Sequence, residues 1–161
     1  MPDSNIKAAI ITVSDSRNLS EDVSGNALSD LLKSVDAEIV ERLVITDDLE
    51  PLRNMIYGLT EREDINLIIT TGGTGFGPRD NTPEATLAVI EKEAPGIAEA
   101  MRRETAASTP MAMLSRGVCG IRGNTLMINL PGSPKGVKEC FEVIRPVLQH
   151  AVNLINGNTR H

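Results

Sequence analysis

Two short apolar runs constrain the fold of this chain more than any other feature. Residues 8–13 are AAIITV and residues 66–71 are NLIITT. Continuous runs of this kind, rich in β-branched residues, are typical of strands covered on both faces, as in a parallel sheet. A third segment, EIVERLVI at 38–45, also has the composition of a strand. The sequence therefore predicts a sheet with a layer of helices on each face.

Helical stripes and turn residues complete this prediction. Apolar residues recur at helical spacing after each predicted strand, and Ser24 fits the N-cap of the first helix. Residues 115–130 predict two strands around a turn at 122–124. The expected fold class is a three-layer α/β/α sandwich with a mostly parallel sheet and one antiparallel hairpin. We expect one domain over residues 1–161, with a core of about 7–156 and a frayed C-terminal tail.

Composition restricts the function classes. The net charge of −6 and the 2% of aromatic residues argue against a nucleic-acid partner. The N-terminus lacks the pattern of a signal peptide, and no apolar stretch reaches membrane-spanning length, so we expect no membrane association. Cys119 and Cys140 have no metal-ligand spacing. They fit reduced thiols in a core, which favours a cytoplasmic protein.

The glycine-rich segment TTGGTGFGPRDNTPEAT, residues 70–86, is the strongest candidate for a ligand site. Gly72, Gly73, Gly75 and Gly77 fall within six positions, which allows close backbone approach and N–H groups that point into a concavity. The segment matches neither the Walker loop nor the dinucleotide fingerprint. A flexible turn is the alternative. Because the segment directly follows a buried strand, we favour a loop that holds a phosphorylated substrate.

Polar segments follow the predicted strands at their carboxyl ends. Ligands of α/β sheets bind beyond these ends. The rule selects Ser14–Ser16, Thr46–Asp48, Thr71–Asp80 and Asn129–Lys135. The first segment could offer hydroxyl groups and a carboxylate, but it could equally be an ordinary loop.

Two aspartates in these segments are candidate magnesium ligands. Asp48 fits the N-cap of the next helix, so Asp47 is the better candidate after the second strand. Asp80 lies in the glycine-rich segment with no evident structural role. Magnesium prefers one or two carboxylates together with phosphate oxygens, and these two residues could supply them.

Two predicted helix starts differ as anion sites. Ser133 and Thr82 each precede a proline and fit N-cap positions. Lys135 lies in the first turn after Ser133, so Pro131–Lys135 is a suitable anion site, although an ordinary strand-to-helix turn is an equal alternative. Glu84 follows Thr82 and would repel a bare phosphate, although a favourable contact with the helix dipole explains it as well.

The remaining polar candidates are weaker. Arg116 could place a cation at the rim of the site, but such an arginine is more often solvated at an edge. His150 and His161 are isolated and form neither a metal set nor a catalytic set.

Three motifs together resemble a known family. The glycine-rich segment, MLSR at 113–116 and NLPGSPK at 129–135 resemble the molybdopterin-binding family, and within it the stand-alone adenylyltransferases of molybdenum cofactor biosynthesis. The resemblance spans about Lys7 to Asn156. It implies the three-layer fold, a homotrimer, and transfer of an adenylyl group from ATP to the terminal phosphate of molybdopterin with release of pyrophosphate. It also implies a requirement for Mg²⁺.

The resemblance and the residue patterns together define the predicted site. The predicted catalytic and metal-binding residues are Asp47 and Asp80. The predicted substrate-binding residues are Ser14, Asp15, Thr71, Gly72, Gly73, Thr74, Gly75, Arg79, Ser115, Pro131, Gly132, Ser133 and Lys135.

Two alternatives remain at this point. The chain could be a non-catalytic molybdopterin-binding or carrier protein of the same family, or its domain could serve another nucleotide-cleaving pathway. Relatives often have proline and valine where this chain has Thr46 and Asn81, but neither change removes a polar group that the reaction needs. Some members of a sister branch lack the equivalents of Asp47 or Asp80. This chain has both, which favours the enzyme. The metal-insertion protein of the pathway is a further possible partner.

Overall fold

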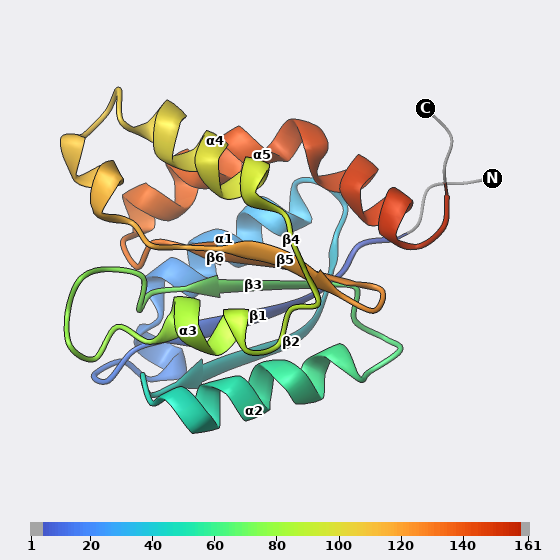
Figure 1. Ribbon diagram of the computed structural model, residues 1–161, viewed down its shortest axis with the longest axis horizontal. Helices are drawn as coiled ribbons and strands as arrows, with labels where there is room; N and C mark the ends of the chain where they lie inside the picture. The colour runs from blue at the N-terminus through green and yellow to red at the C-terminus, as the bar shows by residue number, and fades with distance from the viewer. Residues whose placement is uncertain (1–4, 159–161) are drawn as a thin grey trace.

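Six strands form one mixed sheet in the computed structural model, which describes residues 5–158. The strands are β1 (Lys7–Val13), β2 (Glu38–Ile45), β3 (Leu67–Thr71), β4 (Lys92–Glu93), β5 (Cys119–Arg122) and β6 (Thr125–Leu130). Their order is β2-β1-β3-β6-β5-β4 (Figure 1). The first four strands in this order are parallel, and β5 is antiparallel to both β6 and β4. The predicted mostly parallel sheet with one hairpin is confirmed.

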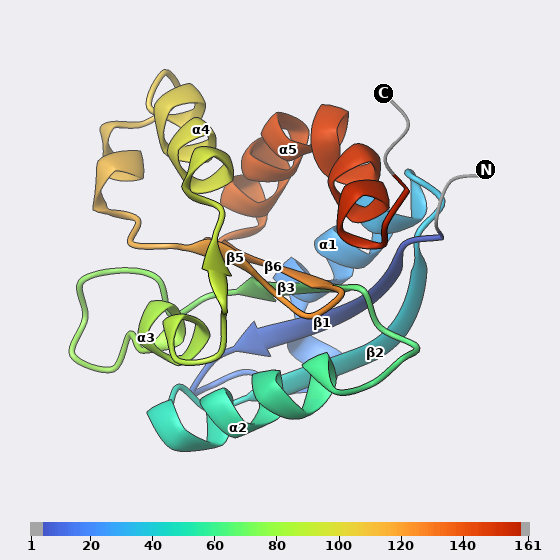
Figure 2. The same ribbon diagram turned by 45° about the vertical axis from the view of Figure 1, so that its right-hand side comes forward.

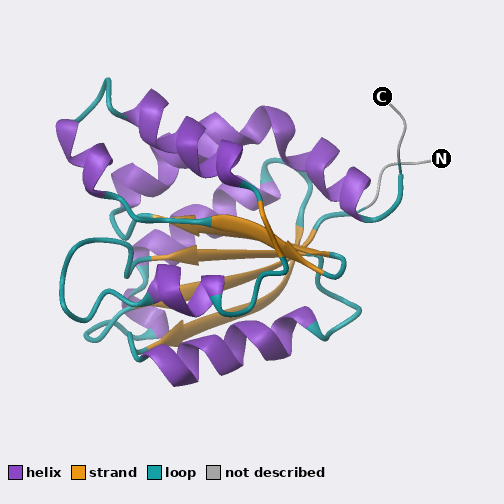
Figure 3. Ribbon diagram, viewed as in Figure 1, coloured by secondary structure: helices purple, strands orange, loops and turns teal. Residues whose placement is uncertain are grey.

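Helices cover both faces of this sheet (Figure 3). The α-helices are α1 (Val23–Lys33), α2 (Leu49–Thr60), α3 (Thr82–Leu87), α4 (Pro95–Thr105) and α5 (Pro134–Ile155), and the 3₁₀ helices are η1 (Leu19–Glu21) and η2 (Pro110–Leu114). Helices α1, α4 and α5 lie on one face, while α2 and α3 lie on the other (Figure 2). The three-layer α/β/α fold is therefore confirmed.

The two apolar runs are buried on both sides because each contributes alternate residues to two cores. Ile10 and Ile69 pack with α1, α4 and α5, whereas Ile11 and Ile68 pack with α2 and α3. All four side chains are inaccessible to solvent. Burial of a side chain of this size contributes about 1.5–3 kcal/mol, so these alternating cores are a main source of stability.

Two predicted helix caps are wrong in detail. Asp22, and not Ser24, caps α1, because its carboxylate accepts the Gly25 N–H at 2.9 Å. Ser24 lies within α1, where its hydroxyl donates to the Gly132 carbonyl at 2.6 Å. Thr82 is the first residue of α3, and its hydroxyl donates to the Gly72 carbonyl at 2.9 Å. Both hydroxyls thus make long-range contacts that hold the loops at the carboxyl end of the sheet.

The start of β1 and the end of α5 lie on the opposite side from these loops (Figure 1). Asn158 is buried, and its N–H donates to the Asn153 carbonyl at 2.8 Å, so the expected fraying does not extend to this residue. The rest of the tail, including His161, lies outside the described residues. Within residues 5–158, no helix has the length and hydropathy needed to cross a membrane.

Candidate functional site

The glycine-rich loop leaves β3 in a backbone conformation that requires glycine. Gly72 and Gly73 have φ angles of +99° and +68°, which side chains rarely tolerate. A Cβ atom at Gly72 would collide with the Val13 carbonyl, and one at Gly73 would collide with the Thr82 hydroxyl. The tight packing against β1 and α3 shows that this part of the segment is a fixed loop and not a loose turn.

Three N–H groups of this loop point to a ligand function. The Gly72 N–H donates to the Leu130 carbonyl at 3.1 Å and is not available. The N–H groups of Gly73, Thr74 and Gly75 have no hydrogen-bond acceptor within residues 5–158. Consecutive unpaired N–H groups in a concave loop are suited to bind an anion.

Asp80 closes the loop and also faces the candidate ligand space. Its Oδ2 accepts the Gly77 N–H at 2.8 Å. A Cβ atom at Gly75 or Gly77 would lie 2.9 Å from this oxygen, so both glycines allow the carboxylate to approach. Asp80 therefore has a structural contact that the sequence did not indicate, in addition to its place beside the unpaired N–H groups.

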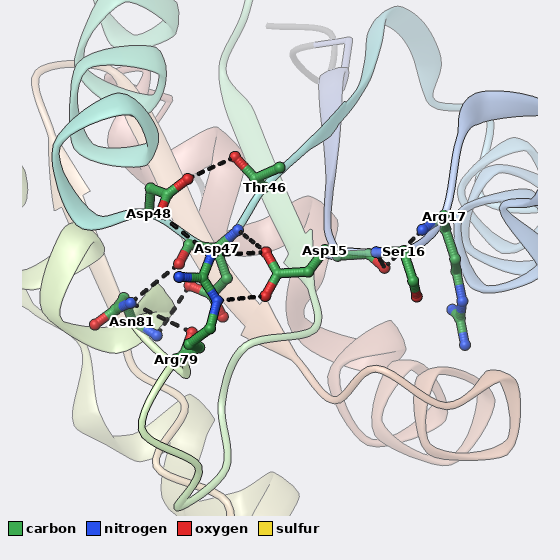
Figure 4. A network of polar contacts seen from close by, with 9 residues as sticks. Asp15, Ser16, Arg17, Thr46, Asp47, Asp48, Arg79 and Asn81 are labelled. Carbon is green, nitrogen blue, oxygen red and sulfur yellow. Dashed lines mark hydrogen bonds and ion pairs between the residues drawn. The ribbon is translucent and has the colours of Figure 1, made fainter.

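Asp47 lies behind the loop and is 5% exposed. Its Oδ1 accepts the Asn81 N–H at 3.0 Å, and the Asn81 side chain donates to the Asp47 carbonyl at 3.1 Å (Figure 4). Burial raises the pKa of Asp47, and the negative charges of Asp80 and Asp15 add to this shift. The two predicted catalytic aspartates are therefore close enough for their charges to interact.

Arg79 is paired with two carboxylates and does not point freely into the site (Figure 4). Its Nε donates to Asp15 at 2.7 Å, and its Nη2 contacts Asp48 at 3.2 Å. The hydrogen bond from Arg79 lowers the pKa of Asp15 to about 2. Asp15 also accepts the Asp47 N–H at 3.0 Å. Asp48 occupies the N-cap position of α2, but its side chain makes no capping hydrogen bond there. Arg79 thus holds Asp15, and Asp15 in turn holds the backbone of Asp47.

Arg116 makes four hydrogen bonds to the glycine-rich loop and α3, which corrects its reading as a solvated edge residue. Its guanidinium donates to the carbonyls of Gly75 at 2.7 Å and Asp80 at 2.8 Å. It also pairs with both carboxylate oxygens of Glu84, at 2.8 and 3.0 Å. Glu84 is thus engaged by an arginine, so its charge is largely balanced. The MLSR motif contained this residue, but its partners lie 32–41 positions away in the sequence and could not be inferred.

An open cavity of about 500 Å³ lies beside the loop. Nine predicted substrate-binding or catalytic residues line it, namely Gly72, Gly73, Thr74, Gly75, Asp80, Ser115, Pro131, Gly132 and Ser133. The predicted cap is confirmed at Ser133, whose hydroxyl accepts the Gly136 N–H at 3.0 Å at the start of α5. The three motifs are therefore brought together around one space.

Six predicted residues do not line this cavity. They are Ser14, Asp15, Asp47, Thr71, Arg79 and Lys135. Thr71 is buried, and its hydroxyl donates to the Pro131 carbonyl at 2.7 Å, which joins two of the loops. Ser14 accepts the N–H groups of Ser16 and Arg17 within its own loop. Lys135 is exposed and lies 3.8 Å from Glu139 on the surface of α5.

A further wall of the cavity comes from α4 and η2. The MLSR motif covers only the end of η2, and the sequence did not associate α4 with the site. Met101, Met111 and Leu114 form an apolar part of this wall, and Arg102 adds a cation. Cys140 lines the cavity as well. Burial raises the pKa of its thiol to about 11, so Cys140 stays protonated at neutral pH and is a poor nucleophile.

The carboxylates fit a metal that arrives with a ligand better than a resident metal. Residues 5–158 contain no group of three or more His, Cys, Asp or Glu side chains placed to hold an ion. Asp47 and Asp80 nevertheless form an adjacent pair whose mutual repulsion a divalent cation would relieve. Such a donor set suits Mg²⁺, which takes one or two carboxylates and completes its coordination with water and phosphate oxygens.

The site combines unpaired N–H groups, a helix start and two neighbouring carboxylates at the carboxyl end of an α/β sheet. This combination is typical of proteins that bind phosphorylated ligands. A family model described as a probable molybdopterin binding domain matches residues 9–150. The chain belongs to this family, as its motifs predicted.

Relatives of known name cover almost the whole chain. Molybdopterin adenylyltransferase from Helicobacter pylori is 37% identical over 95% of this chain and 89% of its own length. The crystal structure of the molybdopterin biosynthesis enzyme MoaB from Thermus thermophilus has a TM-score of 0.87 at 42% identity, covering 94% of this chain and 97% of that chain. Molybdenum cofactor synthesis protein cinnamon from Drosophila melanogaster is 43% identical over 96% of this chain, which spans only 26% of that longer protein.

Proposed function

We propose that this protein adenylylates molybdopterin in molybdenum cofactor biosynthesis. In this reaction an oxygen of the terminal phosphate of molybdopterin attacks the α-phosphorus of ATP. A new P–O–P linkage forms, the bond between the α- and β-phosphates breaks, and pyrophosphate leaves. The observation that carries the proposal is that Asp80 lines one cavity with three residues whose loop N–H groups are unpaired, while Asp47 lies close enough to Asp80 for their charges to interact.

The attacking group determines what the protein must supply. A phosphate is already ionised at neutral pH, so the reaction needs no strong general base from the chain. The chain must hold two strongly negative substrates together and in line, because positioning is the main source of catalysis for such transfers. The N–H groups of Gly73, Thr74 and Gly75 and the start of α5 would bind phosphate oxygens and stabilise charge that develops on them.

Magnesium would be held by Asp47 and Asp80 together with phosphate oxygens. When bound, it would neutralise charge on the ATP phosphates. Asn81 and Asp15 would orient the Asp47 segment through their hydrogen bonds, and Gly77 would orient Asp80. Arg79 and Arg116 would act indirectly, because their charges are already paired with carboxylates.

Release of pyrophosphate from ATP tests this function. We expect release by the purified protein only when both molybdopterin and Mg²⁺ are present. A folded protein that binds molybdopterin but releases no pyrophosphate would instead support the carrier function. Mass spectrometry of the adenylylated product distinguishes transfer from simple hydrolysis of ATP.

We also propose that the chain forms a homotrimer and works in the cytoplasm. The trimer follows from the family resemblance, and an apolar groove between α4 and α5, lined by Ile97, Val147 and Leu154, offers one surface for contact. The free thiols of Cys119 and Cys140 suit a reducing compartment. Light scattering in solution would measure the mass, and a monomer would contradict the trimer.

The metal-insertion protein of the pathway is the partner that would receive the product, and a pull-down with purified proteins would test this contact.

A further inference from the structure

Arg102 is the one cationic side chain among the described residues that line the cavity. It lies in the last turn of α4, next to the end of the MLSR motif, and no sequence motif drew attention to it. Within residues 5–158 it has no carboxylate partner at ion-pair distance. By contrast, Arg79, Arg116 and Lys135 around the same end of the sheet are each paired with an acid. The charge of Arg102 therefore differs from theirs in being uncompensated.

The guanidinium is oriented but not neutralised. Its Nη1 donates to the Gly117 carbonyl at 2.8 Å and to the Ser115 carbonyl at 3.2 Å. Its Nε and Nη2 have no acceptor within the described residues. The Nη1 side of the planar guanidinium is thus held by backbone carbonyls, while Nε and Nη2 remain available as donors to a further partner. A partly buried guanidinium of this kind suits an anion with two neighbouring oxygens, and phosphate has this geometry.

The surroundings of Arg102 favour a phosphate group of a ligand as the partner of its guanidinium. Gly73, Thr74 and Gly75, whose N–H groups are unpaired, line the same cavity. Residues with free donors on the loop and on α4 therefore border one space. The apolar side chains of Met101 and Met111 line the same cavity, and an ionic contact is stronger beside apolar groups than in bulk water.

We propose that Arg102 is a substrate-binding residue that holds a phosphate group in this cavity. The identity of the substrates rests on the proposed adenylyl transfer, but the anion site itself does not. The phosphate could belong to ATP or to molybdopterin, and separate titration of the two substrates distinguishes these sources. Arg102 would bind the phosphate from α4 and so fix its orientation.

Arg102→Gln tests this site, with Arg103→Gln as the matched control. Glutamine can still donate to a backbone carbonyl but has no charge, and Arg103 is exposed and paired with Glu104 on the outer side of α4. We expect Arg102→Gln to raise KM for one of the two substrates about tenfold or more, because hydrogen bonds to charged groups contribute about 1.5–3 kcal/mol. The substrate affected identifies the phosphate. Unchanged KM values for both would overturn the proposal.

A measurement without catalysis separates this site from the proposed function. Inorganic pyrophosphate should raise the melting temperature of the wild type and of Arg103→Gln, and it should raise that of Arg102→Gln much less. This result would hold even if the wild type showed no adenylyl transfer. Equal shifts in all three proteins would overturn the anion site.

Arg102→Lys covers the case in which the glutamine variant does not fold. Lysine keeps the charge and one donor to the carbonyls but loses the planar fork. We expect its KM for the affected substrate to lie between those of the wild type and Arg102→Gln, at least about threefold above the wild type. Wild-type KM values and an undiminished pyrophosphate shift would contradict a forked phosphate contact.

Discussion

The two ends of the sheet both carry a recess and many charges, but they differ in how these charges are satisfied. At the amino-terminal end, a recess of about 670 Å³ borders Arg62, which pairs with Glu41 at 2.9 Å and with Asp64 at 2.8 Å. At the carboxyl-terminal end, the smaller cavity of about 500 Å³ borders an arginine without a carboxylate partner and three unpaired N–H groups. The larger recess is therefore chemically less suited to bind an anion, because the charge of Arg62 is already paired.

This difference shows that charged and polar groups without a protein partner identify a ligand site better than the volume of the recess does. A charge or donor without a protein partner is costly in a half-buried position and becomes favourable when a ligand supplies the partner. At the carboxyl-terminal end, Asp47 is also kept in a buried environment that raises its pKa. Functional sites commonly contain such perturbed groups, whereas surface ion pairs like those of Arg62 contribute little to either stability or function.

Among the variants that test this comparison of the two ends, Asp80→Asn should have the largest effect, measured as kcat for adenylyl transfer. Asparagine retains an oxygen that can accept the Gly77 N–H, so the loop should keep its conformation. It cannot contribute a negative charge to a metal. We expect kcat for adenylyl transfer to fall about 100-fold or more while molybdopterin binding and the circular dichroism spectrum are retained. An unfolded variant would instead indicate that Asp80 acts mainly as a structural residue.

Gly73→Ala should have the next largest effect, measured as the free energy of unfolding. Gly73 has a φ angle of +68°, and an added Cβ would meet the Thr82 hydroxyl and the Asp47 carboxylate. We expect a loss of about 1–3 kcal/mol in urea denaturation, together with lower activity. Gly58→Ala is the matched control, because a Cβ there meets nothing within 4 Å. It lies in α2 and should stabilise the protein by about 0.4–1 kcal/mol. Equal effects of the two changes would contradict the fixed loop.

Asp47→Asn should separate stability from activity. The folded-state pKa of Asp47 is raised above its ordinary value of 3.8, so the folded protein binds this proton more tightly than the unfolded chain. The ionised group therefore lowers stability as the pH rises through and above 3.8. We expect Asp47→Asn to melt at a higher temperature than the wild type at pH 7 and to lose activity.

The pH dependence provides the control for this interpretation. The advantage in melting temperature should shrink as the pH falls toward 3.8, because the raised pKa makes folded Asp47 take up its proton before the unfolded chain does. A variant that is less stable than the wild type at pH 7 would show that the hydrogen bond from Asn81 outweighs the cost of burial.

Arg62→Ala should have the smallest effect. The residue is partly exposed, and its pairs with Glu41 and Asp64 lie at the end of the sheet that we do not assign to ligand binding. We expect kcat and KM within error of the wild type and only a slight decrease in melting temperature. A large loss of activity would break the contrast between the two ends.

The sequence predicted what depends on local pattern. The apolar runs at 8–13 and 66–71 indicated buried parallel strands, and the Ser133–Pro134 pair indicated a helix start. Glycine spacing indicated a closely packed loop of special backbone conformation, because left-handed conformations and close approach both require glycine. These features involve neighbouring residues, whose preferences a sequence displays directly.

Contacts between distant segments could not be predicted in the same way. No pattern in the sequence indicated that α4 would supply Arg102 to the cavity, since its partners come from residues 115 and 117 in a loop of irregular structure. Arg79 was expected to bind substrate, but its side chain pairs with Asp15, which lies 64 positions away. Likewise, α1 begins at Val23 and is capped by Asp22 where Ser24 was expected, and the Asp22 carboxylate also accepts from Thr12 in the adjacent strand at 2.7 Å.

A crystal structure with a non-hydrolysable ATP analogue and Mg²⁺ would test the central claim most directly. We predict that the analogue's phosphates lie against the N–H groups of Gly73–Gly75, with Mg²⁺ at about 2.0–2.1 Å from a carboxylate oxygen of Asp47 or Asp80. Phosphates bound in the recess beside Arg62, or a magnesium ion remote from both aspartates, would contradict the account.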